Sequence, residues 1–268
     1  MANPHIENLG LKLGRKTQGE DLDPVPRSLG RSQLKDPPEF FGHDLWNAYE
    51  VSYLQPNGKP VVHHMQLRYD AHSPAIVESK SLKLFLNSFN NQHFEDLQQF
   101  STRISHALTL CVGARVELSF FQTDQSPAPK SLDGLCIDEL QPSTLSANYD
   151  PILLQDIHRQ GPHRYVSHLL RTNCPVTNQP DWGAVRIKFD GDLDLVPESL
   201  LAYLISFRNH QDFHESCCET IYTDLYHLLK PRWLEVACYY TRRGGLDINP
   251  HRSSRMSYHT RTEPVWRQ

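Results

Sequence analysis

The sequence lacks the features that mark several classes of protein. None of its apolar runs approaches the roughly 20 residues that a helix needs to cross a bilayer. Its first residues lack the charged-then-apolar pattern of a secretion signal, so we expect a cytoplasmic protein without a membrane partner. Blocks of basic residues are also absent and the net charge is -4 with histidine neutral. Direct binding to nucleic acid is therefore not expected.

Cysteine pairs at metal-binding spacing are missing too. The six cysteines include no CxxC, and a chain of 268 residues can bury its own core without disulfide bonds. The 15 histidines are scattered, and the adjacent His63 and His64 lie in a strand-like run, where neighbouring side chains point to opposite faces. We therefore expect reduced thiols and no metal site.

What the sequence does contain is an alternation of strand-like and helix-like periods that occurs twice. Each half has the order strand, strand, helix, helix, strand. This order predicts an antiparallel sheet with two helices packed on one face, which is an α+β fold. The strand-like runs lie at 46–69 (a hairpin), 114–120, 164–171, 185–189 and 234–240, and the helical runs lie at 78–89, 94–108, 197–207 and 221–229.

The repeat also divides the chain. The words Glu78-Ser79 and Glu198-Ser199 open the first helix of each half, and a repeat of this length indicates a duplicated domain rather than a solenoid. Each half carries groups that the other lacks, so we expect one composite site from a pair of halves. The predicted parts are an N-terminal arm at 1–40, rich in Gly, Pro and charge, a first unit at 41–150 and a second unit at 151–268.

A loop at 172–183 carries the most reactive groups of the chain. Two prolines, two asparagines and a glycine lie between strand-like runs, and the loop holds the thiol of Cys174 and the carboxylate of Asp181. A thiolate is the strongest side-chain nucleophile near neutral pH, and a nearby acid can return protons to the group it attacks. The simpler alternative is a turn with a buried, inert cysteine. The composition of the loop favours a catalytic pair.

Three further stretches carry binding groups. At 78–85 a helix begins, and its free N–H groups together with Lys80 and Lys83 can hold an anion. At 213–215 a carboxylate suits the paired N–H donors of a guanine-like ring. At 242–247 arginines can pair with phosphate and glycines allow close approach. Each stretch also has a simpler interpretation, as a capped helix, a helix start with a surface histidine, or a charged strand end.

Together these four stretches resemble the nitrile reductase family of 7-cyano-7-deazaguanine reductases in its bimodular form. ESKSLKLF at 78–85 matches the family signature, and the loop at 172–183, FHE at 213–215 and RRGGLD at 242–247 match in the family's order. The resemblance implies tandem tunnelling-fold (ββαα) units around a central channel, in a homodimer. It also implies the NADPH-dependent four-electron reduction of the nitrile preQ0 to the aminomethyl compound preQ1, on the route to queuosine in tRNA.

The resemblance further implies a role for each site residue. Cys174 would attack the nitrile carbon to form a covalent thioimidate, and Asp181 would act as the general acid. Cys217 carries a separate hypothesis, a protective disulfide with Cys174, against the simpler interpretation of a core cysteine. The expected substrate-binding residues are Val77, Glu78, Ser79, Phe213, His214 and Glu215, and the expected NADPH-binding residues are Ser79, Lys80, Lys83, Arg242, Arg243 and Gly244.

Two other classes of function stay open at this stage. A tunnelling-fold hydrolase of the cyclohydrolase type would use Cys174 without NADPH, but with a metal whose Cys and His ligands cannot be assembled from the sequence. A non-catalytic purine- or pterin-binding module would have no use for an acid beside the thiol. Consumption of NADPH on addition of the cyano compound distinguishes the reductase from both.

Overall fold

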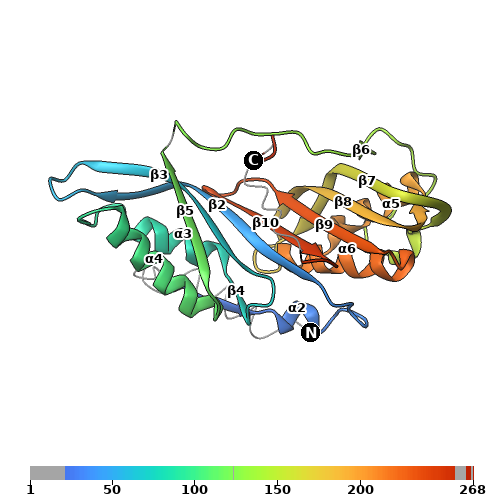
Figure 1. Cartoon of the computed structure of the whole chain (residues 1–268), viewed down its shortest axis with the longest axis horizontal. Helices are drawn as coiled ribbons and strands as arrows, with labels where there is room; N and C mark the ends of the chain where they lie inside the picture. The colour runs from blue at the N-terminus through green and yellow to red at the C-terminus, as the bar shows by residue number, and fades with distance from the viewer. Residues whose placement is uncertain (1–21, 123, 257–263, 267) are drawn as a thin grey trace.

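The computed structural model describes residues 22–122, 124–256, 264–266 and 268, and its centre is one eight-stranded sheet. The strands are β2 (Phe41–Leu54), β3 (Pro60–Asp70), β5 (Val116–Gln122), β6 (Leu135–Cys136), β7 (Asp156–Asn173), β8 (Pro180–Leu195), β9 (Trp233–Tyr240) and β10 (Leu246–Ser253). They stand in the order β5-β3-β2-β10-β9-β8-β7-β6, and every pair is antiparallel except β6 with β7. Figure 1 shows the sheet running the length of an elongated molecule.

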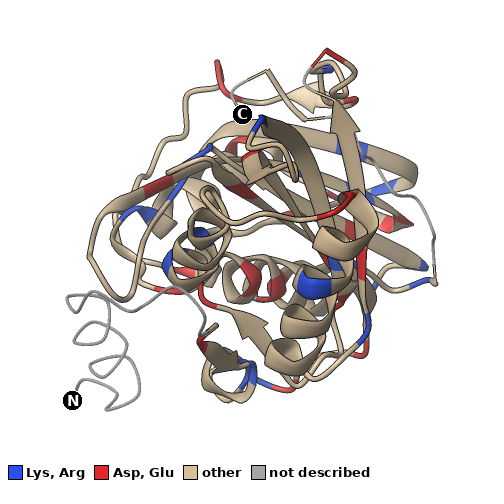
Figure 2. Cartoon of the chain, turned by 90° about the vertical axis from the view of Figure 1, so that its left-hand side faces the viewer, with Lys and Arg blue, Asp and Glu red and all other residues tan. Residues whose placement is uncertain are grey.

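The helices of both halves cover one face of this sheet (Figures 1 and 2). The chain twice has the order strand, strand, helix, helix, strand, which confirms the predicted α+β class. Among the described residues no helix is both long and apolar enough to cross a membrane. The helices are α2 (Ser28–Arg31), α3 (Ser79–Ser88), α4 (Leu97–Val112), α5 (Pro197–Ser206) and α6 (His214–Leu229), with short 3-10 turns at Pro151–Leu153 and Phe207–Asn209.

Each half has its own apolar core between helices and sheet. In the first half, the predicted stripe of α3 is buried, as Leu82 and Phe85 show, and it packs with Phe100 of α4. In the second half, Leu204 of α5 and Ile221 of α6 are fully buried against β8 and β9. The period of 3.6 residues therefore identifies the buried side of α3 and α4, whereas α5 is buried on most of its surface.

The strand β10 joins the two halves, and the sequence predicts only a strand end and a turn there. It pairs with β2 from Leu246 opposite Ala48 to Ser253 opposite Phe41, and with β9 through its last residues. All of its residues are buried, including charged ones. A strand that is covered on both faces shows no alternation of polar and apolar residues, so its pattern is invisible to periodicity. β7 also begins earlier than the predicted strand at 164–171.

Part of the predicted N-terminal arm is integrated into the fold. Pro24–Pro26 forms the short strand β1, which pairs antiparallel with β4 (Ala75–Val77), and α2 packs against α6. The side chain of Arg27, between β1 and α2, is only 4% exposed. Residues 1–21 of the arm lie outside the described residues.

Candidate active site

A cavity of about 520 Å³ lies where the two halves meet, between α3, the loop after β7 and the turn before β10. A much smaller cavity adjoins it and is walled by Trp46, Phe213 and Ile248. Cys174, Asp181 and the start of α3 line both, so the predicted catalytic pair lies at their junction. Predicted residues in the larger cavity are Glu78, Ser79, Lys80, Lys83, Cys174, Asp181, His214, Arg243 and Gly244, and those in the smaller cavity are Val77, Glu78, Ser79, Cys174, Asp181, Phe213, His214 and Glu215.

The loop between β7 and β8 holds Cys174 and Asp181 on its two arms. Cys174 donates its N–H to the carbonyl of Gln179 at 2.9 Å, and Asn178 donates back to the carbonyl of Cys174 at 2.9 Å. Asn178 has a positive φ of 55°, a conformation that asparagine tolerates better than most residues. Asp181 lies opposite Thr172 in the ladder. The closed loop therefore presents a half-exposed thiol beside a carboxylate fixed in a strand.

Asp181 is buried between two basic side chains. Nε2 of His214 lies 3.7 Å from one carboxylate oxygen, and the guanidinium of Arg243 bonds the other while also reaching Gln179. Burial raises the pKa of Asp181, but His214 and Arg243 together outweigh it, so the pKa lies below its usual range. In the ligand-free protein Asp181 is thus a carboxylate, which can accept a proton before it donates one.

Glu78 caps α3 rather than leaving the start of the helix free. Its carboxylate accepts hydrogen bonds from the N–H groups of Lys80 at 3.0 Å and Ser81 at 2.6 Å. Burial raises the pKa of Glu78, although these two N–H groups oppose the shift. Two donors of the predicted anion site are therefore already occupied. What α3 still offers to the larger cavity is the charge of Lys80 and Lys83.

Glu215, in the first turn of α6, has an unsatisfied carboxylate. It is 2% exposed, and its Oε1 has no hydrogen-bond partner in the described part of the chain. Burial, strengthened by the charge of Asp44, raises the pKa of Glu215 to about 7. Leaving a buried carboxylate oxygen without a donor is costly, so an atom of this kind on a cavity wall indicates a ligand with N–H groups.

The residues predicted to bind the cofactor divide into two groups. Five of them line the larger cavity: Ser79, Lys80, Lys83, Arg243 and Gly244. Arg242 lines neither cavity, because its guanidinium lies 4.5 Å from the ring centre of Tyr49 and 3.7 Å from the carboxylate of Glu50.

Gly244 adopts a left-handed conformation with φ of 60°, in a tight turn where Arg243 and Leu246 exchange backbone hydrogen bonds. A Cβ atom at Gly244 would lie 2.6 Å from Nζ of Lys83. A larger residue in this turn would therefore displace the end of the Lys83 side chain and strain the left-handed backbone.

The structure adds a carboxylate to which the sequence assigned no role. Asp247 lines the larger cavity, is 1% exposed, and accepts hydrogen bonds from Tyr49 at 2.6 Å and Asn47 at 2.7 Å. Burial raises the pKa of Asp247 to about 6. In the sequence, only its place in the RRGGLD stretch pointed to Asp247.

Cys217 is fully buried and free, and burial raises the pKa of its thiol.

Two groups among the described residues have ligand atoms close enough for a metal ion. One is Cys136 with Asp138 and His168, and the other is His210 with Asp212 and Cys217, each with its atoms within 4.8 Å of one another. The second group adjoins the smaller cavity, because Asp212 lines it. The prediction of no metal therefore requires an experimental test.

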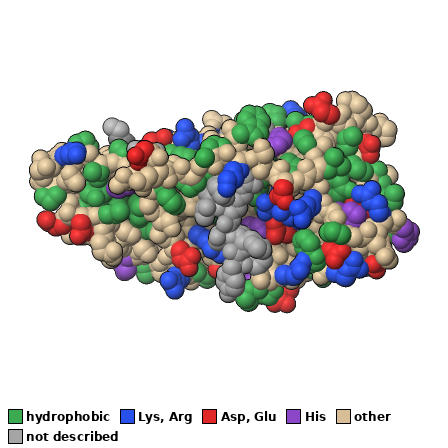
Figure 3. All heavy atoms as spheres, turned by 45° about the horizontal axis from the view of Figure 1, so that its top comes forward, with side chains coloured by type: hydrophobic (Ala, Val, Ile, Leu, Met, Phe, Trp, Pro, Cys, Tyr) green, Lys and Arg blue, Asp and Glu red, His purple; other side chains and the backbone are tan. Residues whose placement is uncertain are grey.

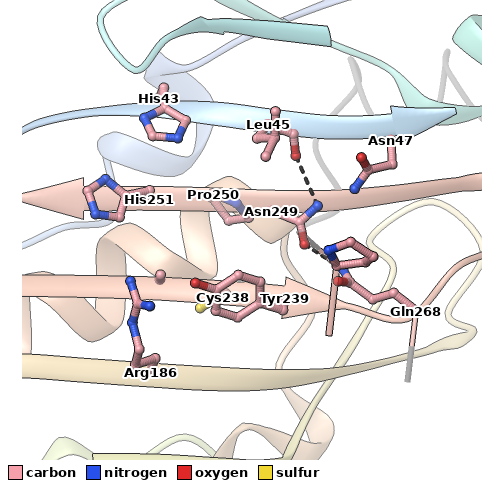
Figure 4. Close-up of a pocket in the computed structure, with 12 residues that line it drawn as sticks. His43, Leu45, Asn47, Arg186, Cys238, Tyr239, Asn249, Pro250, His251 and Gln268 are labelled. Atoms are coloured by element: carbon pink, nitrogen blue, oxygen red, sulfur yellow. Dashed lines mark hydrogen bonds between the residues drawn. The ribbon is translucent and has the colours of Figure 1, made fainter. Parts of the chain in front are cut away.

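A separate cavity lies on the sheet face that the helices leave uncovered (Figure 4). His43, Asn47 and His251 point into it, and the carboxamide of Gln268 donates to the carbonyl of Tyr240 at 2.9 Å. Its volume of about 20 Å³ suits roughly one water molecule. It contains none of the predicted site residues.

On the side of the molecule shown in Figure 3, acidic and basic side chains are intermixed.

Two family models and several named proteins match this chain in sequence. The family model described as "Nitrile reductase, 7-cyano-7-deazaguanine-reductase N-term" matches residues 15–120, and one described as "QueF-like protein" matches 180–259. The NADPH-dependent 7-cyano-7-deazaguanine reductase of Legionella pneumophila (strain Corby) is 44% identical over 239 residues, which cover 87% of this chain and 84% of that protein. The enzyme of the same name from Coxiella burnetii (strain RSA 493) is 41% identical over 253 residues, covering 92% and 90%.

Likeness among solved structures is weaker. The archaeosine synthase QueF-Like in the apo form aligns with a TM-score of 0.30 and 16% identity, over 38% of this chain and 92% of that chain. Membership therefore depends on the sequence relatives and on the matched family models. On those grounds, the chain belongs to the nitrile reductase family of 7-cyano-7-deazaguanine reductases.

Proposed function

We propose that this chain reduces the nitrile of 7-cyano-7-deazaguanine (preQ0) with NADPH to the aminomethyl group of preQ1, for the synthesis of queuosine. Its relatives carry the name of this reductase. The observation that carries the proposal is the meeting of Cys174, Asp181 and the unpaired carboxylate of Glu215 around two adjoining cavities. In this proposal the unit at 41–150 supplies Lys80 and Lys83 for NADPH. The unit at 151–268 supplies Arg243 for NADPH together with the nucleophile, the acid and the substrate carboxylate. A homodimer and a cytoplasmic location stay predictions.

The smaller cavity is proposed to receive the deazaguanine ring. The carboxylate of Glu215 accepts hydrogen bonds from the adjacent ring N–H and amino groups, and Glu78 and His214 complete the polar wall. Trp46 and Phe213 offer apolar surface to the ring faces. Because this cavity measures only about 20 Å³ in the free protein, its walls must move apart as the ring enters. Substrate binding thus includes a local rearrangement of the cavity walls.

The chemical step begins at Cys174. The sulfur adds to the nitrile carbon, so that one C–S bond forms and one π bond of the C≡N group breaks. The proton of the thiol passes to the carboxylate of Asp181, which then donates it to the nitrile nitrogen as negative charge develops there. The product is a neutral thioimidate, whose C=N bond is a better hydride acceptor than the nitrile.

The larger cavity fits NADPH by size and charge. Its volume of about 520 Å³ lies within the range of roughly 300–1,000 Å³ typical of small-molecule sites. Lys80, Lys83 and Arg243 place positive charge on its wall, where phosphate groups can pair with them. When bound, NADPH supplies the hydride equivalents, two for a four-electron reduction. Asp181 and Glu215 are both buried, so water has little access to that side of the reacting carbon, where hydrolysis of an imine would divert the reaction.

The test is an absorbance assay at the nicotinamide band after addition of preQ0. We expect about two NADPH oxidised for each preQ1 formed, and no oxidation with Cys174→Ala. The conservative variant Asp181→Asn should lower kcat while leaving the affinity for preQ0 in place. Release of ammonia from preQ0 without oxidation of NADPH would instead identify a hydrolase. Binding of preQ0 without any turnover would identify a binding module.

A further inference from the structure

Behind Glu215 lies a set of buried charged side chains that the chemistry described above does not use. Arg252 is fully buried and donates to Asp44 at 2.8 Å and to Glu219 at 2.8 Å. Arg27 forms a second ion pair with Asp44 and lies 3.8 Å from Glu219. The set, named here the buried charge cluster, consists of Arg27, Arg31, Asp44, Glu219 and Arg252.

Glu215 lies directly beside this cluster. Glu215 and Glu219 are four residues apart on α6, so their side chains lie on the same face of the helix. Both line a small cavity together with Arg27. Figure 2 shows acidic positions on a helix that other elements enclose. The cluster contains three guanidinium groups and two carboxylates, so a third carboxylate, that of Glu215 in its ionised form, balances its charge.

Two members of the cluster come from the part of the N-terminal arm that the structure describes. Arg27 follows β1, and its guanidinium also donates to Ser73. Arg31 lies in α2 and donates twice to Glu219, at 2.8 Å each. α2 packs so closely on α6 that a Cβ at Gly30 would lie 2.1 Å from Oγ of Ser216. The position of Glu215 is thus tied to the arm.

Residues 22–31 also contact Glu78, the second carboxylate on the wall of the smaller cavity. The carbonyl of Asp23 accepts the N–H of Glu78 at 2.9 Å, and the N–H of Asp23 bonds Oγ of Ser81 at 3.0 Å. β1 extends this contact by pairing with β4, which leads directly into Glu78. One short segment therefore holds the backbone of Glu78 on one side and the charges beside Glu215 on the other. In Figure 1 the segment lies next to β4, beneath the sheet.

We propose that residues 22–31 form part of the substrate-binding apparatus, with Arg27 and Arg31 as positioning residues that hold Glu215 as a carboxylate for a ring with paired N–H donors. The inference rests on the proposed function, because it concerns the same ring site. It assigns a role to the arm, which the sequence alone leaves without one.

The charges that face Glu215 support a pH-dependent test. They are Asp44 of β2, Tyr69 of β3, Arg27 and the adjacent His214. Burial and the charge of Asp44 raise the pKa of Glu215, whereas His214, Arg27 and the backbone N–H of Glu215 lower it, and the balance is a pKa of about 7. Removing the charge of Arg27 takes away one of the three effects that lower the pKa of Glu215. The pKa of Glu215 then rises, and the carboxylate form is lost at a higher pH than before.

The experiment measures the affinity for preQ0 between about pH 5.5 and 9 in the Cys174→Ala background, where no covalent bond can form and no NADPH is needed. Affinity should fall as pH decreases through the pKa of Glu215, because the protonated acid accepts fewer hydrogen bonds. With Arg27→Met we expect the midpoint to move up by roughly one unit, which is about tenfold in affinity on the acidic side. Arg27→Lys should keep the original midpoint.

Two controls separate this effect from loss of folding. Arg31→Met removes a charge from a side chain that is 28% exposed, so it should fold and shift the midpoint in the same direction by less. Arg232→Met removes an exposed guanidinium whose partners, Asp190 and Asp192, do not belong to the buried charge cluster, and it should leave the midpoint unchanged. With Glu215→Gln, affinity should be weak at every pH and Arg27→Met should add no shift.

An unchanged midpoint in both Arg27→Met and Arg31→Met would overturn the inference while leaving the proposed function intact. Failure of the Cys174→Ala protein to bind preQ0 at any pH would instead count against the proposed function itself. A shift in Arg31→Met alone, where Arg27→Met does not fold, would support the inference.

Discussion

At the scale of single residues, Asp181 has the most constrained position in the site. It lies between His214 and Arg243, which together lower its pKa against the effect of burial. Arg243 is also the arginine that lines the larger cavity. One side chain thus contacts both the proposed proton donor and the proposed phosphate site. Binding of a phosphate at Arg243 would weaken its ion pair with Asp181, raise the pKa of that carboxyl and so favour its protonated form.

Arg243→Gln tests this double contact. Loss of the guanidinium should raise the KM for NADPH about tenfold, the effect of losing one charge-assisted hydrogen bond. It should also raise the pKa of Asp181, so that the acidic limb of the kcat profile moves to higher pH. Arg242→Gln is the matched control, since Arg242 lies over Tyr49 and outside both cavities. Equal effects from the two variants would contradict the assignment.

Glu215→Gln should reveal a conflict between stability and function. The pKa of Glu215 is raised to about 7 in the folded protein, above the 4.5 of an unperturbed glutamate. The native state therefore binds a proton that the unfolded state releases, and stability falls as pH rises from about 4.5 through about 7. A glutamine at position 215 does not titrate, so the variant does not lose stability over this pH range.

Urea unfolding of both proteins at pH 5 and pH 8 provides the measurement. The free energy of unfolding of Glu215→Gln, relative to the wild type, should increase between these two values, while affinity for preQ0 is lost. A difference that stays constant with pH would show that Glu215 is already ionised throughout.

At the scale of elements, the sequence predicted the helices and the reactive loop but not the strand that joins the halves. Leu82 and Phe85 repeat with helical period because only one side of α3 is buried. β10 is buried on both faces, and its Asp247 and Arg252 are paired inside the protein. Such residues look like a surface turn in a sequence. Their partners come from β2 and α6, which no local pattern can reveal.

In the site, too, features with a local pattern could be predicted, and features that depend on distant partners could not. The Cys174 loop was recognisable because its proline and asparagine content is local. That Arg242 turns to Tyr49 while Arg243 turns to Asp181 depends on the turn geometry at Gly244. Likewise, the occupation of the α3 N–H groups by Glu78 depends on a cap that the sequence allows but does not require.

Gly244→Ala tests the turn as an element. Its Cβ would lie 2.6 Å from Nζ of Lys83, so the substitution should displace that lysine and weaken NADPH binding several-fold. Gly58→Ala is a matched control, because Gly58 also has a positive φ but no atom within 4 Å of its Cβ. Both variants should lose about 1 kcal/mol of stability from backbone strain. NADPH affinity, measured by titration, should change only with Gly244→Ala; an equal change in both would refute the contact.

At the scale of the whole molecule, the site exists only because the two halves form one sheet. β10 and the turn before it place Asp247 and Gly244 on the cavity wall with α3 of the first half, while β8 brings Asp181 from the second. A single half would contain either the lysines or the thiol, not both. If the chain is a duplicated domain, as the sequence predicts, this arrangement gives one site for the pair of units.

Removal of metal ions tests the competing hydrolase at this scale. The reductase chemistry uses a thiol, a carboxylate and NADPH, so prolonged dialysis against a chelator should leave kcat unchanged within error. The group of His210, Asp212 and Cys217 beside the smaller cavity makes the test necessary. Loss of turnover that is restored by one added divalent metal would favour the metal-dependent alternative.

The most direct test of the central claim is the mass of the protein after incubation with preQ0 in the absence of NADPH. The account predicts an increase equal to one whole preQ0 molecule, because addition of a thiol to a nitrile expels no atom. Peptide mapping should place this mass on Cys174, and Cys174→Ala should show none. No adduct on the wild type under conditions where preQ0 is turned over, or an adduct on a different residue, would contradict the account.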